Sequence, residues 1–245
     1  MPVVGFASLH GSPGATALAL AVAHQLPART GRRPVLVEAD QDGGTLAARF
    51  GLPGSPSLMD LAGAARVGAP SHGVDACAQS LPSGLALVAA PPVGDRVTAA
   101  LRTAGAPLAR FFADLADVDV VVDLGRIRAT DLSNPLVTGV DCLVVVGRSA
   151  PEELVLLLSR IETLPRPVTE LVLVGRRHYA AAEVAAAAGL EHVHEVPEDA
   201  KAVSVDPSAS RRGQWQQAVH SLADRVARRL DAAAPRSAEG LEGAA

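Results

Sequence analysis

The sequence predicts an α/β protein with a doubly wound, mainly parallel sheet and helices on both of its faces. Three observations support this fold class. Apolar, strand-like runs alternate with alanine-rich helical stretches almost to the end of the chain, as parallel strands with crossover helices require. The first run leads through a glycine-rich turn directly into a helical stretch. Finally, a chain of 245 residues, 49% hydrophobic and 20% charged, can bury a substantial core as one α/β domain.

The expected elements follow from the positions of these runs and from their boundary residues. We expect strands at residues 3–8, 34–39, 85–89, 118–123, 141–147, 170–175 and 192–196. We expect helices at residues 16–27, 44–51, 57–66, 95–104, 107–116, 151–163, 180–188 and 214–230. Pro151, followed by two glutamates, is a favourable helix start, and Gly189 is a favourable C-terminal cap for the alanine-rich helix before it. From Trp215 to Leu230, apolar residues recur at helical spacing, which indicates core packing rather than membrane attachment.

One domain is expected to account for residues 1–231, because no internal repeat or second domain is visible. The stretch 68–84 is the least regular part and is predicted to be a connection or a short edge strand. From residue 232 the apolar pattern is lost, so we expect a disordered C-terminal tail at residues 232–245.

Charge and cysteine content limit the kinds of partner. The net charge of −4 provides no overall field for nucleic acid, and the arginine pairs are scattered, so DNA binding is not expected, although a local basic patch stays open. Cys77 and Cys142 fit no metal or redox spacing and are expected to be reduced thiols. No segment resembles a secretory signal or reaches membrane-spanning length, so we expect a soluble, cytoplasmic protein without an integral membrane segment.

The turn after the first strand carries the most informative pattern, H-G-S-P-G-A-T-A at residues 10–17. Its order of strand, glycine turn and helix places free backbone N–H groups at the start of a helix, where the dipole favours a phosphate. The P-loop pattern has the same layout, with a lysine for the phosphates and a hydroxyl for Mg²⁺. Here Thr16 supplies the hydroxyl, but Ala15 stands in the lysine position. A tight turn of any doubly wound fold, with Thr16 only capping the helix, is the alternative interpretation.

Two aspartates end apolar strands. Asp40 follows the run 35–39, and Asp123 follows a valine-rich run. Carboxylates at the carboxyl ends of parallel strands lie in the ligand crevice of such sheets, so we expect both aspartates near the glycine turn. An Asx-turn at Asp40 and a loop cap at Asp123 are the alternatives. Glu38 lies on the same side of its strand as Asp40 without a defined role, and Asp42 is expected to be a turn residue.

Taken together, these segments resemble the MinD/ParA family of deviant Walker A ATPases over roughly residues 2–230. Residues 10–17 align with the family loop K-G-G-V-G-K-T-T, with His10 and Ala15 in place of its two lysines. The other matching segments are residues 35–44, which resemble switch I; residues 120–125, which resemble the Walker B strand and the start of switch II; and residues 196–199, which resemble the V-P-E-D loop beside the adenine. Their order and separation agree with those of the family.

The resemblance implies ATP and Mg²⁺ as ligands and an ATP-dependent homodimer. It assigns Mg²⁺ to Thr16 and Asp123, and it makes Asp40 the catalytic residue that orients the attacking water. The nucleotide-binding residues it implies are Gly11, Ser12, Pro13, Gly14, Ala15, Thr16, Ala17, Gly125, Arg176, Pro197, Glu198 and Asp199.

The two missing lysines shape the expected function. Phosphoryl transfer depends on charges that stabilise the γ-phosphate oxygens, so we expect weak or absent hydrolysis in a positioning or assembly scaffold with an unidentified protein partner, as the resemblance to the TadZ/CpaE group implies. Arg126 and Arg128 either lend charge from switch II or face solvent. The alternatives are an active partition-type ATPase, an amidoligase or biotin-pathway synthetase of the same superfamily, and a pseudo-NTPase that acts only through protein contacts.

Overall fold

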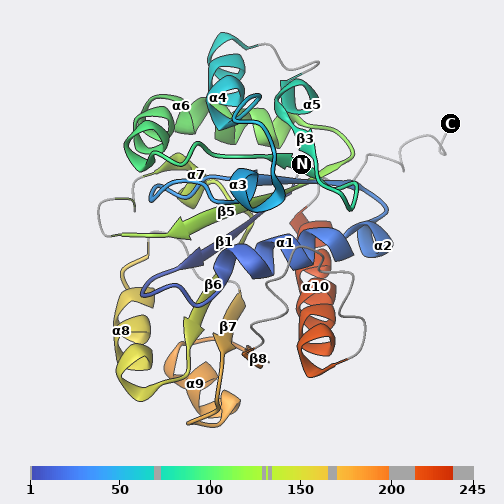
Figure 1. The fold of residues 1–245 in the computed structure, drawn as a ribbon. Helices are drawn as coiled ribbons and strands as arrows, with labels where there is room; N and C mark the ends of the chain where they lie inside the picture. Colours follow the sequence, from blue (N-terminus) through green and yellow to red (C-terminus); the bar gives the residue numbers. More distant parts are fainter. Residues whose placement is uncertain are drawn as a thin grey trace, which may run out of the picture.

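The sheet is the centre of the molecule. A computed structural model describes residues 2–68, 73–128, 131, 134–164, 170–198 and 213–233. Within these residues, eight strands form one sheet in the order β3-β4-β2-β5-β1-β6-β7-β8 (Figure 1). The strands are β1 Val3–Ser8, β2 Arg33–Glu38, β3 Gln79–Ser80, β4 Ala86–Val88, β5 Val118–Arg126, β6 Cys142–Arg148, β7 Glu170–Val174 and β8 Val193–Val196. Every neighbouring pair is parallel except β3 with β4, which confirms the predicted fold class.

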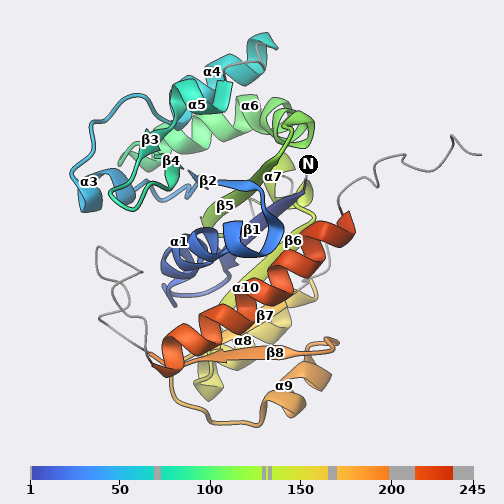
Figure 2. The ribbon, with the colours of Figure 1, turned by 90° about the vertical axis from the view of Figure 1, so that its right-hand side faces the viewer.

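Helices cover both faces of the sheet. The helices are α1 Ala15–Gln25, α2 Pro27–Thr30, α3 Leu46–Phe50, α4 Leu58–Val67, α5 Gly73–Cys77, α6 Gly94–Asp114, α7 Pro135–Thr138, α8 Pro151–Ile161, α9 Ala181–Ala187 and α10 Gln214–Ala233. One core packs α4 to α9 against one face, and a second core packs α1 and α10 against the other. Figure 2 shows α10 lying alongside α1.

The central strands alternate between these two cores. In β1, Val3 and Ala7 belong to the core under α4 to α9, whereas Val4 and Phe6 belong to the core under α1 and α10. Successive side chains of a strand point to opposite faces, so a strand between two helical layers must be apolar at nearly every position. This requirement explains why the strands appear in the sequence as unbroken apolar runs.

Helix α6 corrects the prediction of two helices at 95–104 and 107–116, because one helix continues through Pro107. Proline in a helix interior loses a hydrogen bond and costs about 3 kcal/mol or more. Burying a large apolar side chain contributes about 1.5–3 kcal/mol, so several such side chains on both sides of the proline outweigh that cost. The residues buried on the two sides are Leu101, Ala104, Leu108, Phe111 and Phe112.

The other differences concern the edge of the sheet, the unpredicted short helices α2 and α7, and the C-terminus. The stretch 68–84 contains the short antiparallel edge strand β3, as predicted, together with the unpredicted helix α5. Helix α7 was also not predicted. Helix α10 extends two residues beyond the predicted domain end at 231, and residues 234–245 of the expected tail lie outside the described residues.

Buried residues confirm several details of the sequence analysis. Trp215 and Leu230 are buried with the apolar stripe of α10, and Cys77 and Cys142 are also buried. Gly189 has the left-handed conformation of a helix C-cap. No helix in the described ranges is long and apolar enough to cross a membrane.

A buried ionic cluster joins β7 to α10. The carboxylate of Glu170 is almost fully buried and binds His194 of β8 as well as Arg225 and Arg229 of α10, with distances of 3.1 Å to each. Burial by itself raises the pKa of Glu170, but the hydrogen bond with His194 and the two arginines outweigh it and lower the pKa. Glu170 therefore stays charged and ties the end of the sheet to the last helix.

Candidate functional site

Three loops meet at the carboxyl edge of the central strands. β5 lies between β2 and β1, and Asp123 is in register with Glu38 on one side and with Phe6 on the other. The chain segments that follow β1, β2 and β5 therefore leave the sheet next to one another. This is the position where doubly wound sheets bind their ligands.

The glycine turn lies on this edge. Gly11 and Gly14 have φ values of +62° and +101°, a backbone conformation that glycine adopts without strain. Gly14 is the N-cap of α1 and offers no side-chain oxygen to the first amides of the helix. The first intrahelical bond to the turn runs from the N–H of Leu18 to the carbonyl of Gly14. The amides of Ala15, Thr16 and Ala17 consequently precede the helical hydrogen-bond ladder and are oriented for an anion.

The turn contains no lysine, but an arginine binds the backbone just before it. Ala15 is almost fully buried against the core, and His10 is exposed. Arg160 of α8 donates from its guanidinium to the carbonyl of Leu9, at 2.6 Å, and to the carbonyl of Ile127, at 2.8 Å. Arg160 therefore links the segment before the turn to the segment after β5, a role that the sequence did not indicate.

Asp123 lies beneath the turn with its carboxylate fully buried. Its Oδ1 accepts the N–H of Gly125 at 3.1 Å, whereas its Oδ2 has no hydrogen-bond partner among the described residues. Burial raises the pKa of Asp123 to about 7; the Thr16 hydroxyl and the Gly125 amide act against this rise, and the negative charges of Glu38 and Asp40 add to it. The structure thus brings Asp123 and Thr16 together and leaves one buried carboxylate oxygen without a hydrogen-bond partner among the described residues.

Asp40 faces the same place from switch I. Its Oδ1 accepts the N–H of Asp42 at 2.8 Å, so the Asx-turn considered for this residue is present. The carboxylate also lies against Gly125, where a Cβ atom would stand 2.0 Å from the Asp40 Cγ. Burial raises the pKa of Asp40, and the nearby guanidinium groups of Arg126 and Arg128 lower it in part.

Glu38 has a structural role that the sequence analysis left undefined. Its carboxylate is buried and accepts three backbone N–H groups, from Thr45 at 2.7 Å, from Leu46 at 3.0 Å and from Ala90 at 3.0 Å. Burial raises the pKa of Glu38, and these three hydrogen bonds lower it in part. Glu38 therefore holds the start of α3 and the end of β4 against β2, and it is not available to a ligand.

Asp42 is more than a turn residue, because it joins the loop after β2 to the end of β5 and the loop that follows it. One carboxylate oxygen binds the Arg126 guanidinium at 2.9 Å, and the other binds Arg128. The three side chains are between a third and half exposed. The two arginines thus converge on the ligand edge instead of pointing separately into solvent.

A cavity of about 210 Å³ lies on the other side of the turn, at the carboxyl ends of β6, β7 and β8. Four of its lining residues come from the turn: Ser12, Pro13, Gly14 and Ala17. Pro197 and Glu198 come from the loop after β8, and Arg148 and Trp215 were not predicted to line the site. Arg148 binds Glu198 at 3.0 Å. Arg148 follows an apolar run in the sequence, as Asp40 and Asp123 do, and this signal could have identified it.

Arg176 and Asp199, which were also predicted to bind the nucleotide, are not placed in this cavity. Arg176 is exposed and does not line it; its carbonyl oxygen accepts the Ser149 hydroxyl. Asp199 lies outside the described residues.

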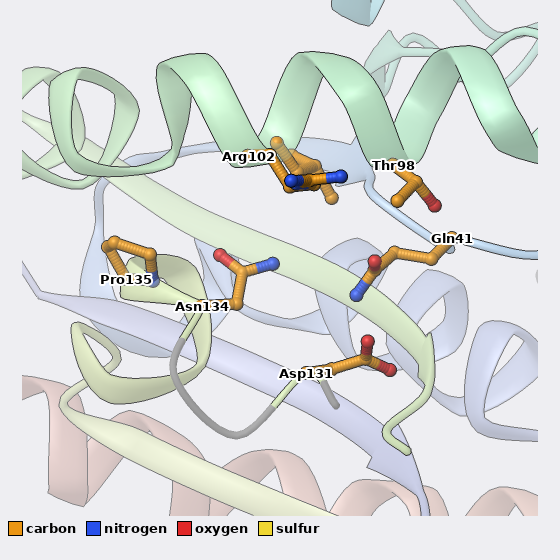
Figure 3. Close-up of a pocket in the computed structure, with 7 residues that line it drawn as sticks. Gln41, Thr98, Arg102, Asp131, Asn134 and Pro135 are labelled. Carbon is orange, nitrogen blue, oxygen red and sulfur yellow. The ribbon is translucent and has the colours of Figure 1, made fainter. Parts of the chain in front are cut away.

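A second cavity, of about 410 Å³, lies beside switch I (Figure 3). Gln41, Thr98, Arg102, Asp131 and Asn134 line it, from switch I, from α6 and from the segment that leads into α7. None of the predicted site residues lines this cavity.

The fold and the glycine turn define a protein with the architecture of a P-loop NTPase, and comparison with solved structures agrees. A ParA family ATPase from Chlorobium tepidum TLS has a TM-score of 0.74 and 19% identity over 91% of this chain and 97% of that chain. The cell division ATPase MinD of Pyrococcus furiosus has a TM-score of 0.69 and 16% identity over 93% and 98% of the two chains. MinD of Pyrococcus horikoshii OT3, complexed with Mg-ADP, has a TM-score of 0.66 and 14% identity over 92% and 95%.

No protein-family model and no curated protein sequence matches the chain. The structural likeness at these identities shows that the chain has the MinD/ParA fold, as the resemblance of its sequence segments predicted.

Proposed function

We propose that this protein binds ATP with Mg²⁺ at the glycine turn and acts as a nucleotide-dependent positioning or assembly protein with weak or no hydrolysis. The observation that carries this proposal is the buried carboxylate of Asp123, which has one open oxygen next to the Thr16 hydroxyl and beneath the free amides of α1. A buried charge without a partner is costly, so a site of this kind fits a cation that accompanies an anion.

The residues fit Mg²⁺ better than a metal bound by the protein alone. No group of three or more His, Cys, Asp and Glu side chains in the described parts of the chain is arranged to hold a metal. Mg²⁺ is commonly bound by one or two protein oxygens, with substrate phosphates and water supplying the rest. Thr16 and Asp123 would hold it, and bound Mg²⁺ would neutralise part of the phosphate charge.

The backbone amides of Ala15, Thr16 and Ala17 would bind the phosphates, as at other helix N-termini. The cavity lined by Pro197 and Glu198 would accept the base. Trp215 also lines this cavity and contributes to its apolar wall.

Asp40 would orient a water molecule; this role is supported by its carboxylate, which lies against Gly125 near the end of β5. Neither lysine of the family loop is present, so the charge that stabilises the γ-phosphate in the transition state is reduced. Slow or absent turnover follows from this loss. An ATP-dependent homodimer that recruits a protein partner would then use the bound nucleotide as a conformational signal.

Trp215 provides a direct assay, because it is the only tryptophan of the chain and it lines the proposed base cavity. Its fluorescence should change in a saturable way when ATP or ADP is added with Mg²⁺. The variants Thr16→Ala and Asp123→Ala should lose the Mg²⁺ dependence. The matched control is Thr103→Ala, since the Thr103 hydroxyl bonds only to carbonyls within α6.

The same titration separates the alternatives. Absence of binding at millimolar nucleotide would leave a pseudo-NTPase that acts through protein contacts. Turnover of about 1 per second or more in a hydrolysis assay would indicate an active partition-type ATPase instead.

A further inference from the structure

The contact between Asp42 and two arginines places positive charge where the missing lysines leave none. Arg126 is the last residue of β5 and is in register with Ser8, the last residue of β1 before the glycine turn. Arg128 follows two residues later and shares the Asp42 carboxylate with Arg126. Both guanidinium groups also act on Asp40, so their charge reaches the edge where the turn, switch I and switch II meet.

We propose that Arg126 and Arg128 bind the terminal phosphate of a nucleoside triphosphate, and that Asp42 holds them in the nucleotide-free protein. This inference rests on the proposed function and deepens it, because it identifies the residues that distinguish a triphosphate from a diphosphate. The turn at residues 10–17 contains no lysine or arginine that could supply this charge.

Charge and geometry both favour this exchange. An exposed ion pair contributes little to stability. Here two arginines share the partly exposed carboxylate of Asp42. A terminal phosphate has more negative charge and more acceptor oxygens than an aspartate, and the planar guanidinium binds such oxygens in pairs. A triphosphate can therefore displace Asp42, whereas a diphosphate, which ends before this point, cannot.

The exchange would also couple nucleotide to conformation. Asp42 belongs to the loop after β2, whereas Arg126 ends β5 and Arg128 belongs to the loop that follows β5. With Asp42 bound, the two loops are tied to each other; with a phosphate bound, the arginines are tied to the nucleotide and switch I is released. A ligand shifts an equilibrium between two conformations only if it makes different contacts in each of them. Here the arginines contact Asp42 in one conformation and the terminal phosphate in the other.

The test is a Trp215 fluorescence titration with MgATP and with MgADP. The double variant Arg126→Gln/Arg128→Gln should weaken MgATP binding by at least about tenfold, as expected for lost charge-assisted hydrogen bonds, and MgADP binding by less than about threefold. Asp42→Asn should have the opposite effect and tighten MgATP binding severalfold, because it releases both arginines. The conservative double variant with lysines should retain part of the preference for MgATP.

A matched control is the pair Arg33 and Asp75, which bind at 2.6 Å on the exposed surface at the start of β2. Arg33→Gln and Asp75→Asn should leave both affinities unchanged. Equal weakening of MgATP and MgADP in the arginine variant, or weaker MgATP binding in Asp42→Asn, would overturn the inference while leaving nucleotide binding intact. If the wild-type protein binds neither nucleotide, the proposed function fails and this inference fails with it.

Discussion

Replacing Asp123 by asparagine should make the protein more stable at neutral and alkaline pH, although it removes the proposed Mg²⁺ ligand. The carboxylate is fully buried, and one of its oxygens has no partner among the described residues. An asparagine of the same shape can keep the hydrogen bond from the Gly125 amide through its oxygen and donate from its nitrogen toward the Thr16 hydroxyl. The variant therefore removes a buried charge without creating a cavity.

The magnitude follows from the pKa of Asp123, which burial raises from 3.8 to about 7. The folded protein binds this proton more tightly than the unfolded chain, so stability falls as pH rises between these two values and stays reduced above pH 7. Each pKa unit corresponds to about 1.4 kcal/mol, so the full effect is on the order of 4 kcal/mol. The gain from Asp123→Asn should be about 2 kcal/mol at pH 5 and about 4 kcal/mol at pH 8.

Denaturant unfolding of both proteins at pH 5 and pH 8, without nucleotide or Mg²⁺, measures this difference. Glu38→Gln is the matched control, because Glu38 is also buried with a raised pKa but has backbone donors on both oxygens. The glutamine nitrogen would face one of these donors, so this variant should lose about 1–3 kcal/mol. The reasoning is refuted if Asp123→Asn is no more stable at pH 8, or if its gain is the same at both pH values.

Three further predictions concern single substitutions. Glu170→Ala should lower the free energy of unfolding by about 1–3 kcal/mol in denaturant titrations, because the buried His194 side chain loses its hydrogen-bond partner and the partly exposed Arg225 and Arg229 lose an ion pair. Since the pKa of Glu170 is lowered, the wild-type protein should lose the same stabilisation as pH falls through that pKa. Gly125→Ala should abolish the Trp215 response to MgATP, because its Cβ would stand 2.0 Å from the Asp40 Cγ at a φ of +59°; normal binding would contradict the site geometry. Ala15→Lys should tighten MgATP binding by about tenfold or more, by restoring a phosphate ligand, and unchanged affinity would argue against a phosphate at the turn.

The sequence by itself determined the fold class and the edge where the site lies. Strands buried on both faces must be apolar at nearly every position, and the crossover helices need their own periodic stripes, so both elements are visible locally. The turn at residues 10–17 and the aspartates at strand ends are also local patterns. Because parallel strands end at a common edge, the sequence alone predicts that Asp123 and Thr16 lie close together, and the structure shows this contact.

Only the tertiary structure decided which partners these residues have. Nothing near Pro107 in the sequence shows that packing on both sides would carry one helix through it. The three backbone donors of Glu38, the two arginines on Asp42 and the meeting of Arg148 with Trp215 beside the turn join residues from separate elements of the fold. Contacts of this kind depend on which helices and strands pack next to one another. The charge of a side chain in the sequence does not specify which residue it will contact. The arginine pair that we propose in place of the missing lysines is therefore visible only in the folded chain.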